Sequence, residues 1–195
     1  MTTFVGLTGG IGAGKSTALA ALAQLGAATL SSDAVVHELY EADAVRDAVI
    51  AHFGDEVAPG GVVDRAAIAR IAFASDADRD WLERLLWPLV RERVRAWRED
   101  VERAAPPVAV AVVEIPLLFE AGLESSFDAT VTVMAPEELR RERADARGHE
   151  GLAARRARQL TQEEKAARST YVVVNDGDRR QLQSALSSVL GMLNG

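Results

Sequence analysis

The sequence contains no cysteine, so disulfides, thiolate nucleophiles and cysteine-ligated metal sites are excluded. It also lacks any apolar run that approaches the roughly 20 residues needed to cross a bilayer. The first five residues carry no basic group of the kind that opens a secretory signal. We therefore expect a cytoplasmic protein that does not insert into a membrane.

Positive charge is also in deficit. The formal net charge is -7, and a broad surface for nucleic acid or anionic lipid would need an excess of Lys and Arg. An anionic ligand must therefore be held by a local basic site. With 48% hydrophobic and 26% charged residues, the chain has the balance of a globular protein, and its 195 residues suit one domain with a small inserted subdomain.

Short apolar segments alternate with helical patterns along the chain. Strands are expected at residues 4–8, 27–30, 108–113, 129–134 and 171–174. This alternation predicts an α/β fold with a five-stranded parallel sheet flanked by helices. Residues 44–103 hold no convincing strand and predict a helical insertion, interrupted at residues 59–61 and at Pro88. A helix opening at residue 136 and a second one over residues 150–168 are expected before the last strand.

The first strand leads into the phosphate-loop pattern Gly9-x4-Gly14-Lys15-Ser16, which is followed by a helix. The glycines let the backbone turn so that its N–H groups point at phosphate oxygens, and the helix start adds its positive dipole end. Lys15 can reach the β- and γ-phosphates, and the Ser16 hydroxyl can bind Mg²⁺. We predict that the chain binds a nucleoside triphosphate and uses it as a phosphoryl donor.

The loop alone does not select the acceptor, since GTPases, ATPases and small-molecule kinases share it. The only D-x-x-G lies at residues 145–148, at the end of an arginine-rich helix, and N-K-x-D is absent, which argues against a GTPase. Motor ATPases and helicases are usually larger. The remaining class is the compact kinases of small metabolites, which need an acid or base near the acceptor hydroxyl and basic groups over the phosphates.

Two features could supply these parts. Asp33 follows the second strand at the carboxyl edge of the sheet, where it could accept a proton or help to bind Mg²⁺, although it could equally cap a helix. Arg143 and Arg147 are four residues apart and share a helical face. They could close over the triphosphate, although an exposed basic helix would look the same in sequence.

From end to end, the sequence resembles the dephospho-coenzyme A kinase family. The resemblance rests on residues 7–17, Asp33, Asp64-Arg65, the Ile115-Pro116-Leu117-Leu118-Phe119-Glu120 motif, Arg143 with Arg147, Arg155 with Gln159, Glu164-Lys165 and Asn175. It implies a P-loop kinase core with a helical acceptor-binding insertion and a lid. It also implies ATP-dependent phosphorylation of the ribose 3′-hydroxyl of dephospho-CoA, the last step of coenzyme A synthesis.

The resemblance assigns roles to individual residues. The expected catalytic residues are Lys15, Asp33 as the base, Arg143 and Arg147. The expected ATP-binding residues are Gly10, Ile11, Gly12, Ala13, Gly14, Lys15, Ser16, Thr17, Arg143 and Asn175, and the expected Mg²⁺ ligands are Ser16 and Asp33. Residues 1–40, 105–135 and 169–195 are expected to form the nucleotide-binding core, residues 41–104 the acceptor subdomain, and residues 136–168 the lid and the helix after it.

Four places depart from the family pattern. Ser31 replaces the first aspartate of a D-x-D motif, His37 stands where arginine is frequent, Trp87 stands where His-Pro is usual, and Ser169-Thr170 replaces Ala-Asp. We expect Trp87 to pack on an apolar helix face. Two alternatives stay open: a P-loop kinase of another metabolite or nucleotide, and an ATP-binding homologue that has lost transfer activity.

Overall fold

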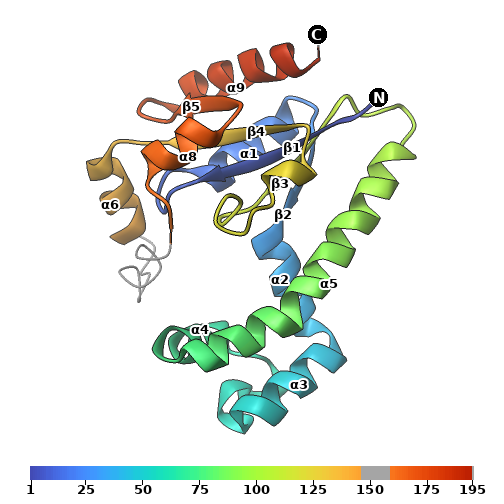
Figure 1. Cartoon of the computed structure of the whole chain (residues 1–195), viewed down its shortest axis with the longest axis vertical. Helices are drawn as coiled ribbons and strands as arrows, with labels where there is room; N and C mark the ends of the chain where they lie inside the picture. The colour runs from blue at the N-terminus through green and yellow to red at the C-terminus, as the bar shows by residue number, and fades with distance from the viewer. Residues whose placement is uncertain (146–158, 195) are drawn as a thin grey trace. The chain divides into compact units, whose positions relative to one another are not determined.

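The computed structural model describes residues 1–145 and 159–194. The chain divides into two units, and Figure 1 labels helices and strands of both. The core unit comprises Met1–Ser31 and Trp97–Gly195, and the helical unit comprises Ser32–Ala96.

A five-stranded parallel sheet forms the centre of the core unit, as predicted. Its strands are β1 (Thr3–Gly9), β2 (Ala28–Ser31), β3 (Val110–Glu114), β4 (Ala129–Met134) and β5 (Tyr171–Val174). The strand order is β2-β3-β1-β4-β5, and every neighbouring pair is parallel. Because β1 is the central strand, the loop that follows it leaves from the middle of the carboxyl edge of the sheet.

Helices cover both faces of this sheet, which explains why its central strands are mostly apolar and buried. The helices of the core unit are α1 (Lys15–Gln24), α6 (Glu137–Asp145), α8 (Gln162–Arg168) and α9 (Arg179–Leu193), with a short 3-10 turn η3 (Glu124–Ser126). Leu22 of α1 and Leu186 of α9 pack in one buried cluster with Val5 and Val131 of the sheet. A second cluster, around Phe4, contains residues of the other strand face.

The helical unit holds no strand between residues 32 and 96, all of which are described. It contains α2 (Ser32–Glu41), α3 (Asp43–Phe53), the 3-10 turns η1 (Asp55–Val57) and η2 (Pro59–Gly61), α4 (Arg65–Ala74) and residues 76–96 of α5 (Asp76–Glu102). Its own core is built from Val45, Val49, Val57, Ile68, Leu82 and Leu86. Asp64 caps α4 by accepting hydrogen bonds from the N–H groups of Ala66 and Ala67.

Two expected helix limits were wrong. Pro88 does not interrupt α5, because a proline removes only one N–H group and the adjacent turns are held by the buried Leu82 and Leu86. Residues 159–161 are not helical, so the helix expected over residues 150–168 is not continuous. Thr161 instead caps α8 and forms a capping box with Glu164. In the described part of the chain, no helix is both long enough and apolar enough to cross a membrane.

Candidate active site

The phosphate loop links β1 to α1, and its glycines adopt backbone angles that other residues rarely reach. The φ angles of Gly12 and Gly14 are 76° and 95°. A Cβ on Gly12 would lie 2.3 Å from the carbonyl oxygen of Arg140, and one on Gly14 would lie 2.2 Å from Nδ2 of Asn175. The loop therefore needs glycine both for its conformation and for the close approach of two later segments of the chain.

Lys15 and Ser16 begin the helix that follows the loop. The Nζ of Lys15 donates hydrogen bonds to the carbonyl oxygens of Gly9 at 3.0 Å and Gly10 at 3.2 Å, so its ammonium lies across the loop. Ser16 is exposed in the first turn of α1. The first N–H groups of a helix have no partners within the helix, and with the dipole they favour a bound anion. This end of α1 is thus suited to phosphate groups.

Three polar side chains from the second half of the sequence surround the phosphate loop. The Nε of Arg140 donates to the carbonyl of Ile11 at 3.0 Å, and Nδ2 of Asn175 donates to the carbonyl of Ala13 at 2.8 Å. Nη1 of Arg143 donates to the Asn175 carbonyl at 3.5 Å. The structure thus brings the predicted residues Arg143 and Asn175 to the predicted loop.

A buried carboxylate ends the neighbouring strand. Glu114 is the last residue of β3, is only 5% exposed, and pairs in register with Leu7, two residues before the β1 strand ends at Gly9. It follows four buried apolar residues, 110–113. In nucleotide-binding proteins with this loop, a carboxylate at the end of such a strand is a usual Mg²⁺ partner. The strand was predicted from the sequence, whereas a role for Glu114 was not.

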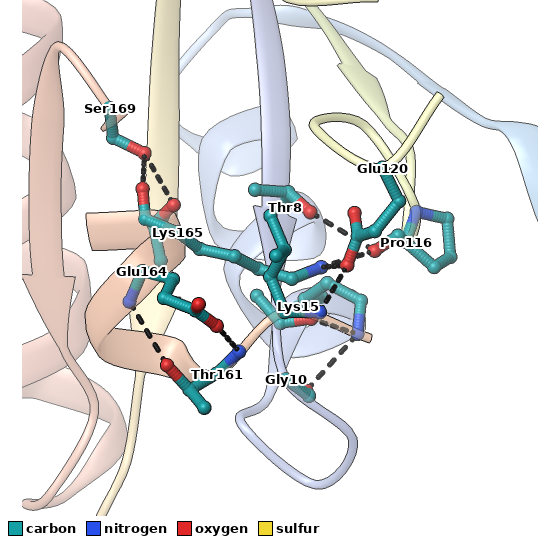
Figure 2. Close-up of polar contacts among 12 residues, drawn as sticks. Thr8, Gly10, Lys15, Pro116, Glu120, Thr161, Glu164, Lys165 and Ser169 are labelled. Atoms are coloured by element: carbon teal, nitrogen blue, oxygen red, sulfur yellow. Dashed lines mark hydrogen bonds and ion pairs between the residues drawn. The ribbon is translucent and has the colours of Figure 1, made fainter. Parts of the chain in front are cut away.

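An ion pair between a buried lysine and a largely buried glutamate lies beside the loop (Figure 2). Lys165 of α8 is fully buried, and its Nζ lies 3.0 Å from Oε1 of Glu120 and donates to the carbonyl of Pro116 at 2.7 Å. That carbonyl also accepts a hydrogen bond of 3.2 Å from the Thr8 hydroxyl. Burial lowers the pKa of Lys165, and the Glu120 carboxylate opposes this shift.

The same helix makes a second buried contact with the sheet. The side chain of Gln162 is hydrogen-bonded to both backbone groups of Ala135: Oε1 accepts from the N–H at 3.0 Å, and Nε2 donates to the carbonyl at 3.0 Å. Ala135 lies directly between β4 and α6, the helix that carries Arg140 and Arg143. Gln162 therefore fixes the start of that helix.

The helical unit contains a cavity of about 350 Å³. Its lining includes His37, Tyr40, Glu41, Arg46, Val62 and Arg65. Nη1 of Arg65 lies 2.6 Å from Nδ1 of His37. Burial raises the pKa of the Tyr40 hydroxyl, and the nearby Arg65 charge partly offsets the rise. The cavity thus combines apolar walls with two guanidinium groups.

Asp33 belongs to this helical unit. It is the second residue of α2 and is exposed, two positions after β2 ends. Its role as the base stays a prediction of the resemblance.

Comparison with known proteins identifies the family. The family model for dephospho-CoA kinase matches residues 3–181. The chain belongs to the dephospho-CoA kinase family. It is 42% identical over 194 residues to the dephospho-CoA kinase of Deinococcus radiodurans, covering 97% of this chain and 91% of that protein.

Solved structures agree with the fold. A crystal structure from Thermus thermophilus matches with a TM-score of 0.81 and 36% identity, covering 100% of this chain and 99% of that one. A shikimate kinase from Acinetobacter baumannii, in complex with shikimate, matches with a TM-score of 0.54 at 14% identity over 99% of this chain and 93% of that one. The latter likeness concerns the fold alone. The predicted P-loop kinase fold is therefore confirmed.

The departure from the kinase family at residues 169–170 has a structural explanation. The Thr170 hydroxyl accepts a hydrogen bond of 3.0 Å from the N–H of Thr130, and the Ser169 hydroxyl contacts that of Thr132. Both pairs join β4 to the entry of β5. They fix the register of the edge strand within the core unit.

Two other departures lie in the helical unit. The expectation that Trp87 packs on an apolar face was wrong, because its side chain is 46% exposed. Pro88 follows it on a solvated part of α5, where the apolar side of the helix is formed instead by Leu82 and Leu86. His37 stands where the family often has arginine. Its imidazole contacts the guanidinium of Arg65, so that a guanidinium also lies at this position here.

Several side chains of the candidate site were not assigned a role from the sequence. Arg140 lies one helical turn before Arg143, and this spacing was the signal for it. Glu120 and Lys165 were noticed only as parts of motifs. Arg147, like Arg155, lies outside the described residues. Among the residues that the structure describes, no three His, Asp or Glu side chains lie close enough together to bind a metal ion.

Proposed function

We propose that this member of the dephospho-CoA kinase family transfers the γ-phosphoryl group of ATP to the ribose 3′-hydroxyl of dephospho-CoA, giving coenzyme A and ADP. The observation that carries the proposal is the phosphate loop held on both sides, by Arg140 at Ile11 and by Asn175 at Ala13. The family match over residues 3–181 names the acceptor class.

The donor would be bound by the loop residues 10–17. Backbone N–H groups and the start of α1 would bind the phosphate oxygens. Lys15 would move from the loop carbonyls to the phosphates. Arg140 and Arg143 would balance the negative charge that shifts toward the leaving oxygen during the transfer. Asn175 would maintain the conformation of the loop through its hydrogen bond to the Ala13 carbonyl.

The chain offers oxygen ligands that fit Mg²⁺, which usually takes one or two carboxylates together with substrate phosphates and water. In the core unit these are the Ser16 hydroxyl at the start of α1 and the buried Glu114 carboxylate at the end of β3. Asp33 is a further predicted ligand. When bound, the ion would neutralise phosphate charge and orient the oxygens.

Asp33 is proposed as the base. Its carboxylate would accept the proton of the 3′-hydroxyl while that oxygen forms a bond to the γ-phosphorus. The bond from the γ-phosphorus to the β,γ-bridging oxygen breaks, and ADP leaves with that electron pair. No phosphorylated enzyme is needed, because positioning and charge stabilisation account for most of this catalysis.

The helical unit is proposed to bind the acceptor. Dephospho-CoA carries a diphosphate and an apolar arm, and the cavity near Tyr40 offers both guanidinium groups and apolar walls. Arg65, which contacts His37, is the strongest candidate for the diphosphate, because Arg46 already forms ion pairs with Asp43 and Asp47.

The proposal is tested by offering dephospho-CoA, nucleoside monophosphates, shikimate and small polyols separately with Mg·ATP and following ADP release. ADP formation that depends on dephospho-CoA and exceeds that with the other acceptors supports it. Faster turnover with another acceptor would reassign the substrate. ATP binding without acceptor-dependent ADP would identify a homologue that has lost transfer activity.

A cytoplasmic location stays a prediction, which fractionation of the source cells tests.

A further inference from the structure

Among the residues that the structure describes, Lys165 is the largest side chain that is completely buried, and it carries a charge. It lies on a seven-residue helix whose other charged residues are exposed. Its Nζ has two described partners, Oε1 of Glu120 at 3.0 Å and the Pro116 carbonyl at 2.7 Å. Both partners lie just after β3, about 45 residues earlier in the sequence.

These contacts join three segments next to the phosphate loop (Figure 2). The Pro116 carbonyl accepts from Lys165 and also from the hydroxyl of Thr8, the residue directly before Gly9. Glu120 in turn accepts the N–H of Leu160 at 2.9 Å, which fixes the chain just before α8. The ammonium is therefore the central group of a network that ends at the base of the phosphate loop.

Helix α8 also contacts the start of α6, whose Arg140 binds the phosphate loop. Gln162, one turn before Lys165, forms two hydrogen bonds with Ala135, at the start of α6. Arg140 on that helix donates to Ile11 in the loop, and a Cβ on Gly10 would lie only 3.3 Å from Cγ of Gln162. One face of α8 therefore contacts both the segment that follows β3 and the start of α6, the helix that bears Arg140.

Stability alone is a poor reason for this arrangement. Moving an ammonium and a carboxylate out of water often costs as much free energy as their attraction returns, and apolar replacements of such pairs are often neutral or stabilising. Here Oε2 of Glu120 is buried and has no hydrogen-bond partner among residues 1–145 and 159–194, which adds a further cost.

We infer that Lys165, together with Glu120, is a positioning residue for phosphoryl transfer: the pair fixes the Pro116 carbonyl against Thr8 and anchors α8, which aligns the arginine-bearing helix with the phosphate loop. This inference rests on the proposed function. Lys165 touches no substrate in this account and acts through the backbone that shapes the site.

The test is the double variant Lys165→Met/Glu120→Gln, which leaves no unpaired charge and keeps an acceptor for the Leu160 N–H. The matched control is Arg168→Met, which removes a cation from an exposed position one turn later on the same helix. For each protein, kcat and both KM values are measured well below its melting midpoint, with ATP binding followed separately by titration. The parent enzyme tests the proposed function in the same assay.

We expect the double variant to melt close to the parent but to lose about 10- to 100-fold in kcat, as is typical of small displacements of catalytic groups. Its KM for dephospho-CoA stays within about threefold, and Arg168→Met behaves like the parent. A folded double variant with the parent's kcat would overturn the inference and leave the proposed function intact. If the double variant does not fold, Lys165→Met alone decides, because the Glu120 side chain is 14% exposed and still accepts the Leu160 N–H. A several-fold loss of kcat in that folded variant supports the inference, and an unchanged kcat refutes it.

Discussion

The side-chain amide of Asn175 donates a 2.8 Å hydrogen bond to the carbonyl of Ala13, which lies 162 residues earlier in the chain. Asn175 is 6% exposed and Ala13 is fully buried, so water has little access to either group. The loop after the last strand of the sheet thus supports the loop after its first strand in chain order. This contact leads to two predictions about the phosphate loop.

Replacing Asn175 with alanine leaves the buried Ala13 carbonyl without its partner, a loss that typically costs about 1–3 kcal/mol. We expect the KM for ATP to rise about tenfold, with a smaller change in the KM for dephospho-CoA. Steady-state kinetics with each substrate varied in turn check this result. Asn194→Ala, at an exposed position after α9, is the matched control and should leave both values unchanged.

Gly14→Ala should abolish tight ATP binding. Its positive φ costs an alanine about 1–2 kcal/mol, and the new Cβ would also lie 2.2 Å from Nδ2 of Asn175. Gly26→Ala separates these two effects, because Gly26 has nearly the same φ of 93° but no atom within 4 Å of its Cβ position. Both variants should melt lower, and only Gly14→Ala should lose ATP affinity in a titration. Equal affinities would show that the contact with Asn175 is unimportant.

Glu114→Gln tests the proposed Mg²⁺ partner. The amide keeps the shape of the buried side chain but removes its negative charge. We expect kcat to fall by about two orders of magnitude, as is typical when a group that stabilises the transition state electrostatically is lost. ATP binding without Mg²⁺ should change little. Comparing ATP titrations with and without Mg²⁺ measures this, and an unchanged Mg²⁺ dependence would remove Glu114 from the site.

Glu164 makes the stability of α8 depend on pH. The N–H of Thr161 donates to its carboxylate at 2.7 Å, and this bond, followed by the Thr161 hydroxyl, lowers the pKa of Glu164 below its ordinary 4.5. The folded state therefore favours the ionised form, and the stabilisation is present above about pH 4.5 and is lost as the pH falls through the lowered pKa.

Urea unfolding of the parent and of Glu164→Gln checks this prediction. The parent should have the higher midpoint near neutral pH, and the two midpoints should converge as the pH falls below 4.5 and through the lowered pKa of Glu164. Glu163→Gln, on the same exposed turn, is the control and should show no such convergence. A difference for Glu164→Gln that stays constant with pH would contradict the assigned role of its charge.

Local patterns predicted most of the core unit. The five strands follow from apolar runs that are short enough for strands, and the run at residues 110–113 is buried on both faces. The phosphate loop follows from its glycines, because the chemistry of binding phosphate by backbone N–H groups requires them at fixed spacing. Arg143 and Asn175 were placed by resemblance, and the structure brings both to the loop.

The polar interior could not be predicted in the same way. In sequence, the segment around Lys165 has the composition of a solvated helix, and only its packing against Pro116 and Glu120 shows that the lysine is buried. Arg140 and Ile11 are 129 residues apart in the sequence. Helix and strand periodicities relate only neighbouring residues, so they could not predict this contact. Pro88 does not end its helix as predicted, because the packing of its neighbours outweighs the one hydrogen bond that it removes.

The most direct test of the central claim is the identity of the phosphorylated product. The enzyme is incubated with Mg·ATP and dephospho-CoA, and the product is analysed by mass spectrometry and ³¹P NMR, with Asp33→Asn run in parallel. The proposed function predicts one phosphate added at the ribose 3′-oxygen for each ADP formed, and no turnover in Asp33→Asn although ATP still binds. Phosphate released to water, phosphate at another position, or full activity in Asp33→Asn would contradict it.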